Sequence, residues 1–396
     1  MTCLGGSKSD NVSPGVGYGT IQRKLKARWY VIISVFLIIL ATIAAGGHIC
    51  YADFEECKNI LGLHATPNEN LATTQTAISY SPSEWAHLKE AFENYLIYYK
   101  KHYSQNHIKY QRFMNFVDNM ESMIKAERRN PSISFGINNF TDWSEEEMQS
   151  MLIKDDLIKV DANISGGTFE APEDHFFSFE KTLDYKWEHD GLDNIVLPDQ
   201  ENYCASSSHL SAFRVQQMIS RKDHHCRTNV QELFECFNKD TVCEGTAPYN
   251  VFEFMKEKGV SCGNAEPFIC NDNTVKRYFV GHVLDAAGSA KNERHMLNLL
   301  KNGFPFTVSV TVPKEFFSYR SGIFEPTPQQ CNQKPSFGKH VMVVVGYGSK
   351  NKTDYWLLQN TIKSIGYKNG FVRWKRGENV CGIADMPLSI VDPRVV

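Results

Sequence analysis

The distribution of cysteine is the feature that most constrains how this chain can fold. The chain has 396 residues and 11 cysteines, and most of these cysteines lie in its second half. These are Cys204, Cys226, Cys236, Cys243, Cys262, Cys270, Cys331 and Cys381. Such clustering is typical of a domain that disulfides cross-link in an oxidising compartment. Zinc binding is the competing interpretation, but no two cysteines have CxxC spacing. We therefore predict disulfides, no metal and no cofactor.

An uninterrupted apolar run, WYVIISVFLIILATIAAG, occupies residues 29–46. As a helix it would rise about 27 Å, close to the thickness of a bilayer core. Basic residues precede the run and acidic residues follow it, which places the N-terminus in the cytosol by the positive-inside rule. We therefore predict a single-pass type II membrane protein, anchored through residues 29–47. Its C-terminal domain would be lumenal or extracellular, in a secretory, lysosome-like or vacuole-like compartment. A cleaved signal peptide is the alternative.

The rest of the chain divides by composition and periodicity. Residues 1–28 form a polar cytosolic segment and residues 48–84 a polar stalk. Apolar residues then recur at helical spacing in two stretches. They are Leu88, Phe92, Leu96 and Tyr99, followed by Phe113, Phe116, Met120, Met123 and Ile124. Residues 151–180 lack such a pattern, and residues 181–396 place helical segments before short strand-like runs. The formal net charge of -3 does not indicate a nucleic-acid partner.

Two motifs lie in the helical region. Arg112, Phe116 and Asn119 form an R-x3-F-x2-N pattern, and residues 136–142 read G-I-N-N-F-T-D, a complete G-x-N-x-F-x-D motif. Together and in this order they resemble the inhibitory propeptides of cathepsin L-type proteases. The resemblance implies a globular prodomain, residues 85–150, whose tail lies along an active-site cleft in the reverse of substrate direction. The chain's own prodomain is then its first expected partner.

The C-terminal part carries further blocks of the same family. Residues 199–208 read D-Q-E-N-Y-C-A-S-S-S, which is similar to the D-Q-x-x-C-G-S-C-W motif of papain-family cysteine proteases with one residue inserted. Three later segments resemble the family's histidine strand, asparagine strand and closing segment. They read GKHVMVVVGYG at 338–348, YWLLQNT at 355–361 and KRGENVCGIA at 375–384.

This resemblance implies an α+β, papain-like two-domain fold, with a helical left domain and a β-barrel-like right domain. Gln200 takes the position of the oxyanion-hole glutamine, His340 that of the catalytic base and Asn360 that of the amide that orients the base. Ser207 stands where the family keeps its catalytic cysteine. His340 and Asn360 follow Ser207 by 133 and 153 residues, a spacing that suits a site assembled across a cleft.

The family's disulfide pairing implies three bridges, while sequence alone does not fix the connectivity. They are Cys204–Cys243, Cys236–Cys270 and Cys331–Cys381, with Cys226 and Cys262 left as a further candidate pair. Asn139, Asn163 and Asn351 open N-x-S/T sequons, so we also expect a glycoprotein.

The walls of the expected cleft depart from the family pattern. Ala205 replaces a glycine, Thr246 replaces the glycine that follows Gly245, and Ser208 replaces a tryptophan. A Cβ at Ala205 or Thr246 would crowd an extended substrate backbone. By resemblance, Asp385 or Met386 lies near the floor of the S2 pocket. Met386 there would favour apolar substrate side chains, and Asp385 would allow basic ones.

Serine at position 207 changes the expected chemistry. A papain-type thiol is ionised before substrate arrives, because a helix N-terminus and a protonated imidazole lower its pKa. A serine hydroxyl is a far weaker acid and needs a base that removes its proton during attack. Our leading hypothesis is a catalytically impaired homologue that binds peptide or protein in the cleft. The alternatives are an active endopeptidase with a Ser207–His340–Asn360 triad, and a structural or adhesive surface protein that uses only the scaffold.

Overall fold

The computed structural model describes only part of the chain. The described residues are 80–158, 185–186, 200, 204–220, 228, 230–237, 242–262, 270, 274–286, 293–367, 370–391 and 394–395. The chain divides into two compact units, residues 1–95 and 96–396. The first unit is described from Tyr80 onward and holds most of helix α2 (Pro82–Tyr98). Leu88 and Phe92 on this helix are buried, as the helical spacing predicts.

The predicted membrane topology needs correction. None of the helices in the described part of the chain is long and apolar enough to cross a bilayer. The longest of them, α3 (Asn106–Arg129), carries charged side chains along its whole length. The anchor proposed at residues 29–47 lies outside the described residues, as do residues 1–28 and 48–79.

Hydrogen bonds link the two prodomain motifs to each other and to the peptidase-like part. Asn119, on α3, donates through Nδ2 to the carbonyl oxygens of Thr141 and Trp143, both at 2.9 Å. Asn138 donates to the carbonyl of Phe317, so the G-x-N-x-F-x-D loop is tied to the peptidase-like part. The apolar face of α3 is buried at the five predicted positions, Phe113, Phe116, Met120, Met123 and Ile124. The helical prodomain predicted from these motifs is confirmed.

Short elements complete the prodomain. Strand β1 (Ser134–Phe135) pairs antiparallel with β7 (Tyr319–Ser321) of the peptidase-like part. Helix α4 (Glu145–Gln149) begins at a capping box formed by Ser144 and Glu147, which satisfies backbone donors at both positions. Arg112 of the first motif forms an ion pair with the same Glu147. A 3-10 helix (Asp155–Ile158) ends the described prodomain.

The strands of the peptidase-like part form one large sheet in the order β5-β12-β6-β9-β10-β11-β8, with β2 paired to β9 beside this path. Neighbours are antiparallel except β11 and β8. The strands are β2 (Tyr185–Lys186), β5 (His282–Asp285), β6 (Phe306–Thr311), β8 (Ile323–Phe324), β9 (Lys339–Lys350), β10 (Thr353–Gln359), β11 (Phe371–Lys375) and β12 (Leu388–Val391). In the described residues the end strands β5 and β8 do not pair, so the sheet is open and the β-barrel-like description needs that correction.

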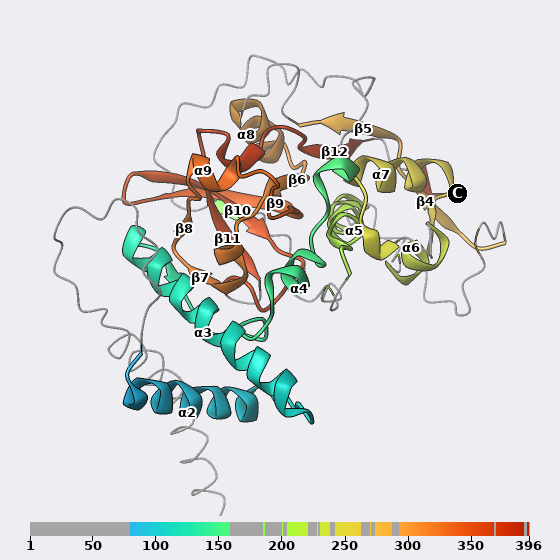
Figure 1. The fold of residues 1–396 in the computed structure, drawn as a ribbon. Helices are drawn as coiled ribbons and strands as arrows, with labels where there is room; N and C mark the ends of the chain where they lie inside the picture. The colour runs from blue at the N-terminus through green and yellow to red at the C-terminus, as the bar shows by residue number, and fades with distance from the viewer. Residues whose placement is uncertain are drawn as a thin grey trace, which may run out of the picture. The chain divides into compact units, whose positions relative to one another are not determined.

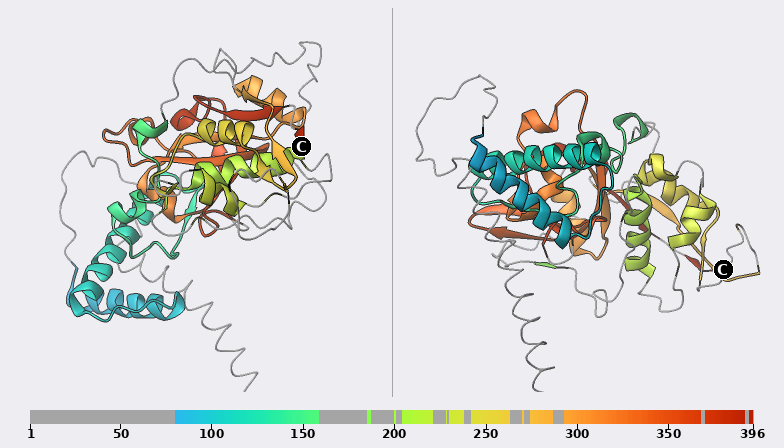
Figure 2. Two further views of the ribbon diagram at one scale, coloured as in Figure 1. Left: turned by 90° about the vertical axis from the view of Figure 1, so that its right-hand side faces the viewer. Right: turned by 60° about the horizontal axis from the view of Figure 1, so that its bottom comes forward.

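The yellow-green helices lie together on one side of this sheet, beside its orange strands in Figure 2. The central helix is α5 (Ser207–Ser220), which packs against β9 and α7. A shared core joins Phe213 and Met218 of α5 with Phe252 of α7 and Val343 of β9. The remaining helices are α6 (Val230–Cys236), α7 (Pro248–Glu257), α8 (Glu293–Lys301) and α9 (Pro328–Cys331). A second small sheet joins β3 (Val260–Ser261), β4 (Arg277–Phe279) and β13 (Arg394–Val395).

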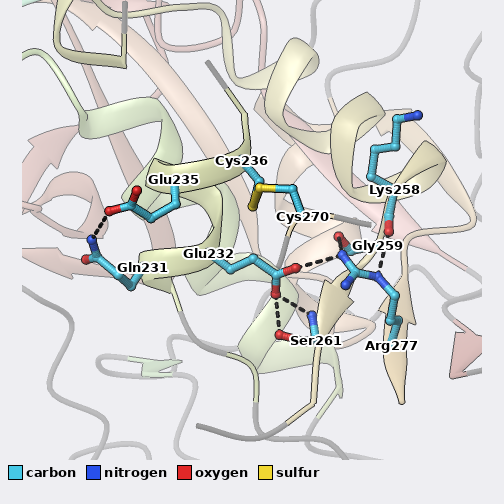
Figure 3. The surroundings of a disulfide bond; sticks show 9 residues. All are labelled: Gln231, Glu232, Glu235, Cys236, Lys258, Gly259, Ser261, Cys270 and Arg277. Carbon is cyan, nitrogen blue, oxygen red and sulfur yellow. Dashed lines mark hydrogen bonds and ion pairs between the residues drawn. A yellow bond between two sulfur atoms is a disulfide. The ribbon is translucent and has the colours of Figure 1, made fainter. Parts of the chain in front are cut away.

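A buried ion pair fixes α6 to the small sheet beside a disulfide (Figure 3). Arg277 lies 2.7 Å from Glu232, and both side chains are buried. The other carboxylate oxygen of Glu232 accepts from the backbone N–H of Ser261 at 2.6 Å. Arg277 also donates through Nε to the carbonyl of Lys258 at 2.8 Å and through Nη2 to that of Gly259 at 3.0 Å, while its buried Nη1 has no hydrogen-bond partner among the described residues.

Candidate active site

Three elements bring the predicted active-site residues together. Ser207 is the first residue of α5, His340 lies at the start of β9, and Asn360 follows the last residue of β10. Because β9 and β10 are paired and α5 packs on β9, residues far apart in sequence meet where β9 begins and β10 ends. Ser207 and His340 are fully buried, and Asn360 is almost fully buried.

His340 and Asn360 are directly hydrogen-bonded. Nε2 of His340 lies 2.7 Å from Oδ1 of Asn360. The Asn360 amide is held in turn, since its Nδ2 donates to the carbonyl of Ile365 at 3.2 Å. Burial lowers the pKa of His340 to about 4, and the hydrogen bond that its ring donates to Asn360 opposes this shift only in part. The imidazole is therefore neutral near pH 7 in this state of the molecule.

Ser207 is not hydrogen-bonded to the histidine in the described structure. Its Oγ accepts from the backbone N–H of Val341 at 3.3 Å. The free ring nitrogen of His340, Nδ1, is buried and has no hydrogen-bond partner among the described residues. The His340 ring is thus held by Asn360, while the Ser207 hydroxyl is hydrogen-bonded to the backbone of Val341 and not to this ring.

Gln200 is held by Thr361, a residue that the sequence interpretation missed. The Thr361 hydroxyl donates to Oε1 of Gln200 at 2.8 Å, and the backbone N–H of Gln200 donates to the carbonyl of Thr361 at 3.0 Å. This leaves Nε2 of Gln200 to donate to the carbonyls of Met151 at 2.6 Å and Cys204 at 2.8 Å. The position of Thr361, next to Asn360, was the only available signal.

The prodomain tail covers this site. In Figure 1 the green segment that follows α4 runs between α5 and the strands of the sheet. Ile153 pairs antiparallel with Lys339, the residue before His340, through two backbone hydrogen bonds of 2.8 Å. Met151 and Ile153 are fully buried. The side-chain amide of Gln200 donates to the carbonyl of Met151, so the donor predicted to bind an oxyanion already has an acceptor.

Ala205 lies where the tail crosses the cleft. It belongs to a small buried apolar cluster with Ile153 of the tail and Val341. Thr246 is partly exposed, and its hydroxyl accepts from the Asn250 side chain at 2.9 Å. Ser208, which stands in place of a tryptophan, donates to the carbonyl of Thr246.

The two candidates for the S2 floor lie in different surroundings. Met386 is partly buried and packs against the core around α5. Asp385 is exposed and lines a cavity of about 740 Å³ together with Thr311 and Lys339. This cavity also borders the prodomain at Arg129, and neither Ser207 nor His340 lines it.

Three disulfides stabilise the surroundings of the site. They are Cys204–Cys243, Cys236–Cys270 and Cys331–Cys381, the three pairs that the family resemblance implies. Cys262 is also disulfide-bonded, whereas Cys226 lies outside the described residues. No cluster of His, Cys, Asp and Glu able to hold a metal ion occurs within the described ranges.

A second buried histidine was also missed. His209 lies on α5, two residues after Ser207, and its ring packs edge-on against Phe237 with centroids 4.9 Å apart. Neither ring nitrogen has a hydrogen-bond partner in the described part of the chain. Burial lowers the pKa of His209 to about 4. Its place directly after the motif at 199–208 was the only sequence signal.

Comparison with protein families agrees with this geometry. Residues 183–391 match the model of the papain family of cysteine proteases, and residues 92–148 match the cathepsin propeptide inhibitor domain (I29). The chain therefore belongs to the papain family of cysteine proteases. It has the organisation of a cathepsin-like precursor, with an inhibitor-type propeptide before the peptidase domain.

Individual relatives cover most of the chain. It is 25% identical over 307 residues to "Cysteine proteinase 3" of Solanum lycopersicum, covering 74% of this chain and 82% of that protein. It is also 25% identical over 308 residues to bovine (Bos taurus) "Pro-cathepsin H", covering 74% and 87%. A solved structure of digestive procathepsin L2 proteinase from Tenebrio molitor larval midgut has a similar fold, with a TM-score of 0.61, 21% identity and coverage of 77% and 100%.

Proposed function

We propose that this chain is the precursor of a papain-type cleft that binds extended peptide or protein segments and in which Ser207 strongly impairs hydrolysis. One observation carries the proposal. The Ser207 hydroxyl accepts from the backbone of Val341, while Nδ1 of His340 lacks a partner among the described residues. A serine nucleophile requires that hydrogen bond to its base.

The way the tail is bound supports peptide binding. Two backbone hydrogen bonds between Ile153 and Lys339, one in each direction, hold an extended segment in the cleft, and the Gln200 side chain donates a third to Met151. Backbone pairing of this kind is the general way in which a strand edge recognises an extended peptide. A peptide from another protein could use the same groups once the tail leaves.

An active endopeptidase is the second candidate. His340 and Asn360 retain a 2.7 Å hydrogen bond, and the relatives named above are described as proteinases or cathepsin precursors. Since the tail fills the cleft, its departure would let Ser207 change rotamer towards His340. Family membership therefore favours hydrolysis, while the chemistry of serine opposes it.

The test compares the wild type with Ser207→Ala and Ser207→Cys after cleavage of the connecting segment and removal of the prodomain. We expect Ser207→Cys to cleave a broad peptide library on the order of 1,000-fold faster than the wild type. The wild type should not exceed Ser207→Ala. Wild-type cleavage that Ser207→Ala abolishes would establish the second candidate instead. Inactivity of all three forms would place the defect in the cleft walls as well as in the nucleophile.

A further inference from the structure

The two residues of the tail at the centre of the cleft point to opposite walls. Leu152 lies against Gly338, because a Cβ added to that glycine would be 2.6 Å from the Leu152 Cβ. Ile153 lies against Gly245, where an added Cβ would be 2.8 Å from Ile153 Cγ1. Side chains of an extended segment alternate in this way. The backbone pairing of Ile153 with Lys339 fixes which residue faces which wall.

Apolar side chains pack around Ile153 on its side of the cleft. Ile153, Ala205 and Val341 form a separate buried apolar cluster, and their exposed fractions are 0%, 1% and 0%. The Cβ that Gly245 lacks would also lie 3.2 Å from the Ala205 Cβ, and Gly245 has φ +89. Gly245 therefore has to remain glycine, and the methyl group of Ala205 forms the adjacent part of the wall.

We propose that Ala205 is a specificity-determining residue. With Gly245 and Val341 it forms a dry pocket that selects a branched aliphatic side chain in any peptide that pairs with Lys339, as Ile153 does. This inference rests on the proposed peptide-binding function. Its chemistry is simple, because a charged or amide side chain in this pocket would be buried without a hydrogen-bond partner. A smaller apolar side chain would leave part of the pocket empty.

The first test uses the full chain and follows amide hydrogen exchange at Ile153 and Lys339, whose N–H groups form the paired hydrogen bonds. Ile153→Val is expected to speed this exchange by roughly 2–10-fold, and Ile153→Ala by roughly 30-fold or more. Ala205→Gly should also speed it, and its effect should largely vanish in the Ile153→Ala background. Residues in contact show such coupling, and residues without shared partners do not.

Leu152→Ala provides the matched control. It removes a tail side chain that faces the opposite wall. In the double variant, the fold-changes in exchange rate caused by Leu152→Ala and Ala205→Gly should therefore simply multiply. Equal coupling of Ala205→Gly to both tail positions would overturn the assignment of Ala205 to the Ile153 pocket. Ala205→Ser, which adds only a hydroxyl, is a second probe and should weaken tail protection if the pocket is dry. Unchanged protection in Ala205→Ser would contradict the proposal.

The second test measures binding of peptides supplied in trans to the full-length Ile153→Ala variant, whose own tail is weakened. The probe is a fluorescein-labelled peptide with the sequence of residues 148–156, compared with copies that carry Val, Ala or Asp in place of the isoleucine. We expect the isoleucine and valine peptides to bind at least 10-fold more tightly than the aspartate peptide. Equal affinity for all four would overturn the specificity proposal. If no peptide binds while the exchange coupling is present, the peptide-binding function fails and the pocket assignment stands.

Discussion

Nε2 of His340 lies 2.7 Å from Oδ1 of Asn360, which leaves Nδ1 as the only ring nitrogen of His340 that can serve as a base. This nitrogen is buried, and Ile153 of the prodomain tail pairs with Lys339, the residue before His340. The relationship between His340 and Asn360 is therefore intact, and the state of the site depends on what occupies the cleft.

The pKa of His340 should report whether the tail is in place. Burial lowers this pKa to about 4 in the closed chain. Ile153→Asp would place a charge in an apolar pocket and expel the tail, so the pKa of His340 should rise towards the ordinary histidine value of about 6.5. Titration of the ring nitrogens by NMR measures the change. The internal control is His209, which lies in the helical core and whose pKa should stay at about 4; a parallel rise at His209 would indicate general loosening.

His209 should make the protein less stable in mild acid. Its pKa is lower in the folded chain than in the unfolded chain, so the unfolded state binds more protons between about pH 6.5 and pH 4. The free energy of unfolding should therefore fall as pH falls through this window, by up to about 1.4 kcal/mol per pH unit for each such histidine. His209→Leu should reduce that slope in urea unfolding measured between pH 7 and pH 5.

The control for this prediction is His282→Leu, which alters an exposed histidine and should keep the wild-type slope. His340 contributes in the same direction, so a residual slope is expected in His209→Leu. An unchanged slope in that variant would show that His209 is not the group responsible.

The buried Glu232–Arg277 pair should be costly to break. Glu232→Ala leaves Arg277 buried without its counter-ion, and we expect a loss of about 3–5 kcal/mol in the free energy of unfolding. Urea denaturation monitored by circular dichroism gives this value. Glu325→Ala removes a carboxylate paired with Lys375 nearer the surface and should cost about 1 kcal/mol or less. Equal losses in the two variants would contradict the role assigned to burial.

Thr361 should act as a positioning residue for Gln200. In a prodomain-free Ser207→Cys background, Thr361→Val removes the donor to Oε1, so Nε2 of Gln200 is no longer directed into the cleft. We expect kcat to fall roughly 10-fold with little change in KM, since an oxyanion donor acts in the transition state. Thr361→Ser keeps the hydroxyl and should restore the rate. A rise in KM alone would instead indicate a role in substrate binding.

Local patterns were sufficient for most elements near the site. The segments 338–348 and 355–361 correspond to β9 and β10, and the two stretches with helical spacing correspond to α2 and α3. These predictions hold because apolar runs and helical spacing reflect the immediate neighbours of each residue. The papain-like fold with its propeptide is confirmed. The predicted single-pass membrane topology is corrected, because none of the helices in the described residues could cross a membrane.

The sequence by itself determined which residues could take part in catalysis, because Ser207, His340, Asn360 and Gln200 sit in recognisable motifs. Only the tertiary structure decided what surrounds them. Ala205 packs with Ile153, from a segment 52 residues earlier, and Met386 packs against the core around α5. The reason is physical: side-chain direction and burial at these positions depend on contacts between distant parts of the chain, which no local period encodes.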